Sequence, residues 1–248
     1  MLIASIVFTF QSCRCDDVNC LNGGICNNGE CDCPIGFIGE SCEVIDFTKI
    51  QDLLNNGTSP LELIRNDVPI DSLYGKIYEG GLIFYLNSDD NSGLITTIDD
   101  IETGTTIFWG CEGNNIVGIS DVVDNPPLSG TEVLPGTRIG DGKLNTLAIV
   151  NECTEVGTAA RICSDLVIDG NSNWFLPSRG ELALMYKNLY LKGLGGFSDL
   201  TSSYWSSSEL NEDAAWTIIF SDAITGGEAG FAGKNFFVAG KVRAVREF

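Results

Sequence analysis

The cysteines near the N-terminus constrain the fold of this chain more than any other feature. Six of its ten cysteines lie between Cys15 and Cys42. A segment this short cannot bury enough apolar surface to fold without cross-links. Zinc sites usually contain paired C-x2-C motifs, and the segment has none, so we expect disulfides rather than a metal. Cys31 and Cys33 are too close in sequence to pair with each other. The disulfides imply an oxidising compartment.

Glycines lie at characteristic places between these cysteines. Asn22-Gly23-Gly24 separates Cys20 from Cys26, and Gly36-Phe37-x-Gly39 lies before Cys42. This pattern resembles an EGF-like module, which covers residues 15–42. The segment lacks the acidic entry sequence of calcium-binding EGF modules, so we expect no calcium there. The resemblance implies three disulfides, namely Cys15–Cys26, Cys20–Cys31 and Cys33–Cys42.

The first residues are typical of an export signal. Residues 2–10 form an apolar run that is too short to span a bilayer. Ser12 then precedes Cys13, as in lipoprotein signals, and the six cysteines of the module leave Cys13 without a local partner. We therefore expect a signal over residues 1–12, a lipidated Cys13 and an anchor region at 13–14, which would hold the protein on a bacterial outer surface. The alternative is an ordinary secretory signal, a secreted protein and a free Cys13.

Charge and composition exclude several classes of function. The net charge is -20, so nucleic acid is not expected as a partner. The chain contains no histidine, which removes Ser-His-Asp and Cys-His catalysis and the usual ligands of zinc hydrolases. We therefore expect no catalytic residue, no bound metal and no cofactor.

Residues 43–71 are expected to form a helical linker. The first helix should use a set of apolar residues at helical spacing. The second should begin at Ser59, with Pro60 at its first position, and end near Arg65. The apolar residues of the first helix are Phe47, Ile50, Leu53 and Leu54.

Residues 72–248 predict one domain of both helices and strands. A capping box of Ser178 and Glu181 predicts the start of one helix. Two other helices are expected over residues 145–153, with Asn145 as a possible cap, and over residues 158–166, capped by Thr158. Alternating or continuous apolar runs predict strands, namely residues 80–86 and 93–98 as a hairpin, 106–109, 215–220 and a terminal strand at 241–246.

Several motifs in this domain match a known family in combination. They are WFLPS-x-x-EL at 174–182, YWSSSE at 204–209, AW-x-x-x-F at 215–220, Lys234 and VRAVR-x-F at 242–248. Together they resemble the collagen-like-adhesin C-terminal domain family. The resemblance implies an α+β fold like the C-type-lectin-like domains of the formylglycine-generating-enzyme group, with small antiparallel sheets, a few helices and long loops. It also implies non-catalytic, adhesin-like binding of extracellular glycans, matrix polymers or protein ligands.

Candidate ligand-binding residues follow from the same motifs. Trp205 and Trp109 are suited to stacking on sugar rings, and Glu209 to accepting bonds from sugar hydroxyls. We expect an exposed site at Trp205 and Glu209, because residues 204–209 are too polar to be wholly buried. The alternative is that both tryptophans are core residues and that the serines brace the core. Trp174 and Trp216 are expected in the core.

A highly anionic ligand would require a local basic patch on this acidic chain. Its clustered candidates are Lys234, Lys241, Arg243 and Arg246.

The remaining cysteines leave a choice. We expect a Cys153–Cys163 disulfide with Cys111 buried and free, and a Cys111–Cys153 disulfide is the alternative. Two other functions stay open: an enzyme on a formylglycine-generating-like fold that uses a free cysteine and a metal, or a structural surface spacer.

Overall fold

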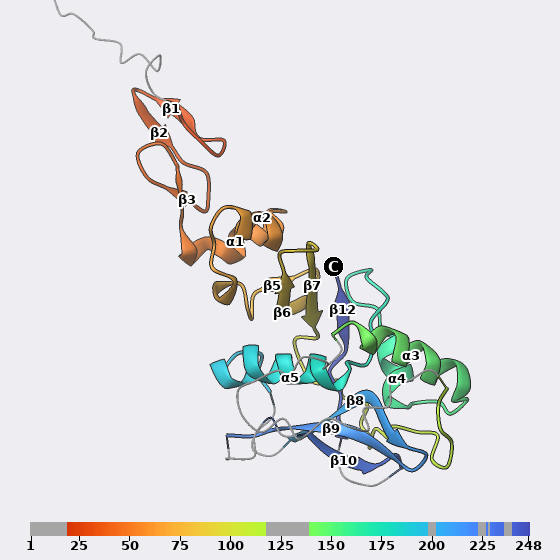
Figure 1. Cartoon of the computed structure of the whole chain (residues 1–248). Helices are drawn as coiled ribbons and strands as arrows, with labels where there is room; N and C mark the ends of the chain where they lie inside the picture. Colours follow the sequence, from red (N-terminus) through yellow and green to blue (C-terminus); the bar gives the residue numbers. More distant parts are fainter. Residues whose placement is uncertain (1–18, 118–138, 198–201, 223–226, 228, 236–239) are drawn as a thin grey trace, which may run out of the picture. The chain divides into compact units, whose positions relative to one another are not determined.

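The computed structural model describes residues 19–117, 139–197, 202–222, 227, 229–235 and 240–248. The chain is an α+β protein (Figure 1) and divides into two compact units, with the boundary between Val68 and Pro69. Cys13 and Cys15, together with the expected signal and anchor segments, lie outside the described residues. Within the described ranges, no helix has the length and apolarity needed to cross a bilayer.

The first unit contains two small antiparallel hairpins. They are formed by β1 (Ile25–Asn27) with β2 (Glu30–Asp32), and by β3 (Phe37–Ile38) with β4 (Val44–Ile45). Such short hairpins are marginal without additional support, and disulfides supply it. Cys20 is bonded to Cys31 and Cys33 to Cys42, which are two of the three pairs that the resemblance implies. Cys26 is also disulfide-bonded, and its expected partner lies outside the described residues.

Two short helices complete this unit. A 3-10 turn, η2 (Phe47–Lys49), leads into α1 (Ile50–Asn55), and α2 (Pro60–Arg65) follows. The cap of α2 is the predicted one, because the Ser59 hydroxyl accepts a hydrogen bond from the Glu62 backbone N–H at 3.2 Å. Phe47 is exposed, contrary to the prediction, since it lies in the turn before the helix. The expected linker thus belongs to the first unit as far as Val68.

The second unit contains two four-stranded sheets. The first has the order β12-β7-β6-β5 and is antiparallel throughout. The predicted hairpin is confirmed as β6 and β7. At its tip, Asn87 and Asp90 accept hydrogen bonds from the backbone two residues further on, as turn residues do. The strands are β5 (Ile77–Tyr78), β6 (Gly81–Asn87), β7 (Ser92–Thr96) and β12 (Val245–Glu247).

The second sheet has the order β10-β9-β8-β11. Its members are β8 (Ser202–Asn211), β9 (Ala214–Phe220), β10 (Ala229–Gly233) and β11 (Gly240–Lys241). β11 runs parallel to β8, and the other pairs are antiparallel. The register of β8 against β9 shifts between Trp205 and Glu209. The serine-rich run is therefore an irregular part of a strand and not a loop.

The prediction of one terminal strand over residues 241–246 is wrong, because this segment contributes to two separate strands, β11 and β12. The chain leaves the second sheet after Lys241 and enters the first at Val245. Val242 and Val245 are both fully buried. Between them, the Arg243 guanidinium donates to the carbonyls of Thr97 and Ile98, which directly follow β7 of the first sheet. The alternating pattern thus reflects a crossing between two sheets.

The α-helices of the second unit are α3 (Asp141–Glu152), α4 (Ala159–Ser164) and α5 (Arg179–Asn188). α4 begins at Thr158, and α5 begins with the capping box of Ser178 and Glu181, as predicted. α3 begins earlier than predicted. Its N-cap is Gly140, and Asn145 is buried inside the helix, where it donates to the Ser207 hydroxyl. The strand predicted at 106–109 is absent, and that segment is irregular.

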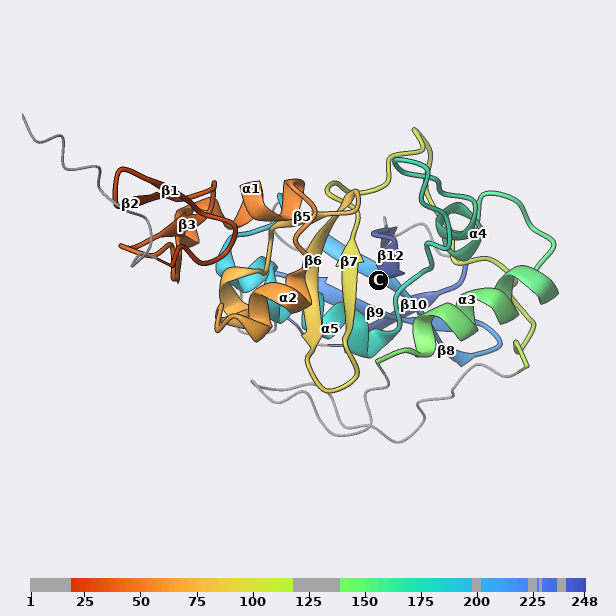
Figure 2. The ribbon, with the colours of Figure 1, turned by 90° about the horizontal axis from the view of Figure 1, so that it is seen from above.

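The core of the second unit lies between the two sheets. Figure 1 shows α5 between them, and Figure 2 shows the hairpin of β6 and β7 in front of α5 with β9 beyond. All three layers contribute buried residues. These include Leu82 and Phe84 from β6, Leu182 and Met185 from α5, and Ile218 and Phe220 from β9. α5 is therefore held on both sides, which fixes the position of its first residue, Arg179.

Candidate functional site

The predicted site residues Trp109, Trp205 and Glu209 are buried. Trp109 and Trp205 are each 1% exposed. The Trp109 indole N–H donates to the Ser206 carbonyl at 2.8 Å, and the Trp205 indole N–H to the Ile107 carbonyl at 3.1 Å. Both rings are core residues whose polar atoms are satisfied within the protein. The prediction of an exposed ligand site at Trp205 and Glu209 is therefore wrong.

Glu209 instead forms a buried ion pair. Its carboxylate lies 2.5 Å from the Lys234 ammonium, and both side chains are almost inaccessible. The ammonium also donates to the Asn114 carbonyl at 2.6 Å and lies over the Trp109 ring. The carboxylate accepts from the Ile116 backbone N–H at 3.0 Å. These bonds connect β8 and the chain after β10 to residues 109–116.

The four basic residues named as candidates for a basic patch do not form an exposed surface. Lys234 and Arg243 are fully buried, and Arg246 nearly so. The Arg243 guanidinium pairs with Asp100 at 2.7 Å, and the Arg246 guanidinium pairs with Glu79. Lys241, which is partly exposed, also pairs with Asp100. Because each cation is engaged internally, the cluster stabilises the fold and offers no ligand surface.

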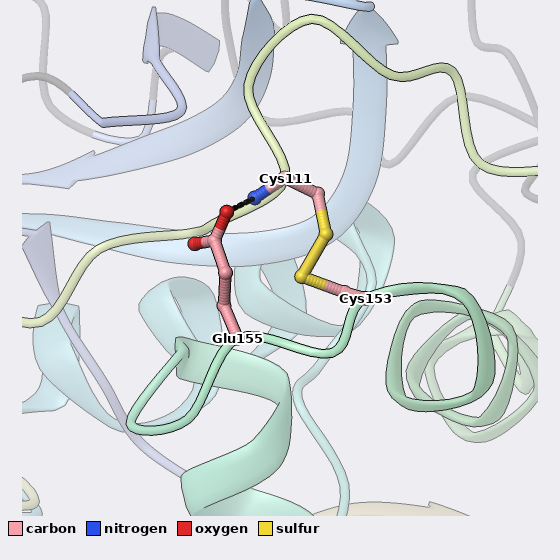
Figure 3. A group of neighbouring side chains, drawn as sticks. All are labelled: Cys111, Cys153 and Glu155. Carbon is pink, nitrogen blue, oxygen red and sulfur yellow. Dashed lines mark hydrogen bonds between the residues drawn. A yellow bond between two sulfur atoms is a disulfide. The ribbon is translucent and has the colours of Figure 1, made fainter.

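The disulfide of this unit joins Cys111 to Cys153, with a Cα separation of 5.7 Å, so the expected Cys153–Cys163 pair is wrong. Cys153 ends α3 with an extended backbone, whereas Cys163 lies on the buried face of α4. Figure 3 shows the Glu155 carboxylate accepting a hydrogen bond from the Cys111 backbone N–H, at 3.2 Å. These three side chains are close enough to hold a metal ion. Both sulfurs, however, are joined in the disulfide, so neither is available as a thiolate ligand for a metal.

Cys163 is the free cysteine of the described residues, and it is buried. Burial raises the pKa of its thiol well above the usual range. A nucleophilic cysteine requires a lowered pKa and access to solvent. Cys163 therefore has neither property that the enzyme alternative would need.

A different cluster carries four of the five buried side-chain nitrogens that have no hydrogen-bond partner among the described residues, the fifth being Nε of Arg246. Arg179 is the first residue of α5, and its backbone N–H donates to the Ser208 hydroxyl at 3.1 Å. The residue is 2% exposed, and the guanidinium carbon lies 4.7 Å from the centre of the Trp216 ring. Nε, Nη1 and Nη2 have no hydrogen-bond partner, and neither has Nε1 of Trp216. Burial lowers the pKa of Arg179.

Trp216 connects this guanidinium to the surface. Trp216 on β9 lies directly opposite Phe231 on β10, and the two rings pack edge to face at 6.3 Å. Phe231 is 66% exposed, and Trp216 is only partly buried, contrary to its predicted core position. Trp174, in contrast, is buried as predicted. We call Arg179, Trp216 and Phe231 the Trp216 site.

Sequence reasoning missed Arg179, although one signal was present. The first turn of a helix favours acidic side chains, because the helix dipole is positive there. Arg179 places a cation at this position, directly after the capping residue Ser178. Such a local conflict between sequence and element often marks a functional position.

Neither a scan against known protein families nor a search of curated proteins found a match to this sequence. Function is therefore argued from the site and its chemistry.

Proposed function

We propose that this protein is an exported surface protein that binds an extracellular glycan or matrix polymer through the Trp216 site. The sequence resemblance to an EGF-like module followed by an adhesin domain with a C-type-lectin-like fold supports an adhesin-like role. Three disulfides among the described residues indicate export to an oxidising compartment.

The pair formed by the exposed Phe231 ring and the partly buried Trp216 ring carries the proposal. Soluble proteins bury most large aromatic rings, yet Phe231 is 66% exposed on β10. Its edge-to-face contact with Trp216 restrains the ring, so little side-chain freedom would be lost on binding. The apolar face of a sugar ring is suited to such a platform, and its hydroxyls remain free for water or polar groups.

A glycan array tests this role. The purified mature chain should bind a subset of glycans, and Phe231→Ala should lose that binding because the exposed ring is removed. The matched control is Val156→Ala, which removes another strongly exposed apolar side chain of the same unit. Phe231→Ala should melt at the wild-type temperature. Equal binding by the two variants and the wild type would refute the site.

Surface attachment is proposed through a lipid on Cys13. A lipidated Cys13 would place the whole chain in the membrane fraction, and Cys13→Ala should release it into the soluble fraction. A Cys13→Ala variant that stays with the membrane, or a soluble wild-type protein with a free N-terminus, would refute the anchor.

A further inference from the structure

We propose that Arg179 and Trp216 bind a carboxylate group of the ligand, which rests on the proposed function and extends it to acidic ligands. The guanidinium and the adjacent indole N–H form a group of buried hydrogen-bond donors without an acceptor. Proteins rarely leave buried polar atoms unpaired, and each such group calls for a partner. An anion with several acceptor oxygens supplies that partner.

Arg179 differs from the other buried cations of the described residues in its hydrogen-bond partners. Arg243 uses all three of its side-chain nitrogens, with Asp100 and with the carbonyls of Thr97, Ile98 and Gly196 as acceptors. Lys234 pairs with Glu209. Arg246 pairs with Glu79 through Nη2, although its Nε has no partner. All three cations therefore have a carboxylate of the protein itself beside them, and Arg179 does not.

The geometry favours a planar carboxylate. A guanidinium presents its N–H groups in its own plane, in a fork that matches the two oxygens of a carboxylate. Trp216 packs on the guanidinium, which restrains it, and its own Nε1–H is a further donor in the same cluster. The chain carries a net charge of -20, so a monoanion meets less repulsion than a sulfate or phosphate dianion.

The site also suits a ring that carries the carboxylate. Phe231 lies beside Trp216 and is exposed. Because Arg179 is 2% exposed, we infer that the Trp216 side chain moves aside when a sugar acid places its carboxylate against the guanidinium and its ring toward Phe231. We therefore expect glucuronate to bind more tightly than acetate, and glucose more weakly than glucuronate.

NMR titration of the wild-type mature chain tests the site directly. Sodium acetate and sodium glucuronate, added against sodium chloride at equal ionic strength, should shift the Nε–H signals of Arg179 and the indole N–H signal of Trp216. The Nε–H of Arg243 is the internal control and should not move. No shift at Arg179 and Trp216, or an equal shift at Arg243, would overturn the proposal. A larger response to sodium sulfate than to acetate would overturn the carboxylate assignment.

A pair of charge-matched variants separates the site from general electrostatics. Arg179→Gln should weaken glucuronate binding about tenfold or more, because charge-assisted hydrogen bonds are lost. Lys187→Gln removes the same charge from an exposed position on the same helix and should bind as the wild type does. Equal affinities for the two variants would refute the role of Arg179. If Arg179→Gln does not fold, the wild-type titration still decides.

Failure here is distinguishable from failure of the proposed function. Acetate has no ring, so its response at Arg179 requires no contact with Phe231. A protein that binds neutral glycans through Phe231 but shows no acetate shift would disprove only the carboxylate site. An acetate shift without any glycan binding would disprove only the glycan-binding role.

Discussion

Glu181 connects two segments of the second unit through one buried carboxyl group. It accepts hydrogen bonds from the backbone N–H of Ser178 at 2.7 Å and from that of Gly140 at 2.8 Å. The first bond caps α5, and the second holds the cap of α3. Burial is the largest effect on this group and raises its pKa to about 7, although the hydrogen bonds act in the opposite direction.

This carboxyl group should make stability depend on pH. Its pKa rises from 4.5 to about 7 on folding, so the folded state binds the proton more tightly than the unfolded chain. The free energy of unfolding should therefore fall as the pH rises from 4.5 to 7. Relative to Glu181→Gln, the wild type should lose roughly 3 kcal/mol over this range. Urea denaturation of both proteins measures the difference, and a difference that does not vary with pH would contradict it.

Lys234 should be essential for folding and not for binding. Lys234→Met leaves the Glu209 carboxylate buried without its cation, and such a loss costs about 3–5 kcal/mol. Adding Glu209→Leu removes the unpaired charge, so the double variant should recover part of the loss. Chemical denaturation measures both. A single variant as stable as the wild type would contradict the structural role of the pair.

At the scale of elements, the disulfide couples α3 to residues 108–114. Cys153 ends α3, and Cys111 lies 42 positions earlier in the chain. The Thr158 cap of α4 follows within a few residues, and the Ala159 backbone N–H donates to the Phe108 carbonyl at 2.9 Å. One covalent bond and one backbone bond thus hold the start of α4 and the end of α3 against the same irregular segment.

Removal of this disulfide should be costly. In the double variant Cys111→Ala/Cys153→Ala, the loop between these two positions, which are 42 residues apart, is no longer closed in the unfolded chain. The variant should lose about 4 kcal/mol of unfolding free energy. Cys163→Ala, which removes a buried thiol without a disulfide, should lose less. Non-reducing peptide mapping should recover Cys111 bonded to Cys153. Recovery of a Cys153–Cys163 peptide, or equal losses in the two variants, would refute the pairing.

At the scale of the whole molecule, the C-terminal residues join both sheets of the second unit. β11 pairs with β8 and β12 with β7, and Val245 also bridges to Phe175. Val242 and Ala244, between the two strands, are fully buried. The last residues thus complete one sheet, extend the other and fill the core between them.

Truncation after Gly240 should therefore unfold the second unit. It removes the buried Val242 and Val245, worth about 1.5–3 kcal/mol each, and the strand β12. The Cys20–Cys31 and Cys33–Cys42 disulfides of the first unit should survive, since they are closed within that unit. Thermal melting and non-reducing peptide mapping measure the two effects. A truncated chain with wild-type melting behaviour would disprove this role.

The sequence alone determined the features that depend on neighbouring residues. The caps at Ser59, Thr158 and Ser178 and the hairpin of β6 and β7 follow from side chains a few positions apart. The start of α3 was not predicted from the sequence, because it depends on a contact with a residue far away in the chain. Gly142 is buried against Glu181, and a Cβ there would come within 2.2 Å of the Glu181 carboxylate.

Only the tertiary structure decided which polar and aromatic side chains are buried. Lys234 meets Glu209 across 25 positions, and Arg243 meets Asp100 across 143 positions. The residues next to a basic side chain in the sequence do not show whether it pairs with a buried carboxylate in the fold. The place of Arg179 at a helix start marks it as unusual, but no pattern shows that Lys234 has a buried carboxylate beside it and that Arg179 has none. Burial and pairing depend on which segments the two sheets bring together, and this arrangement placed Trp205 in the core and Phe231 at the surface.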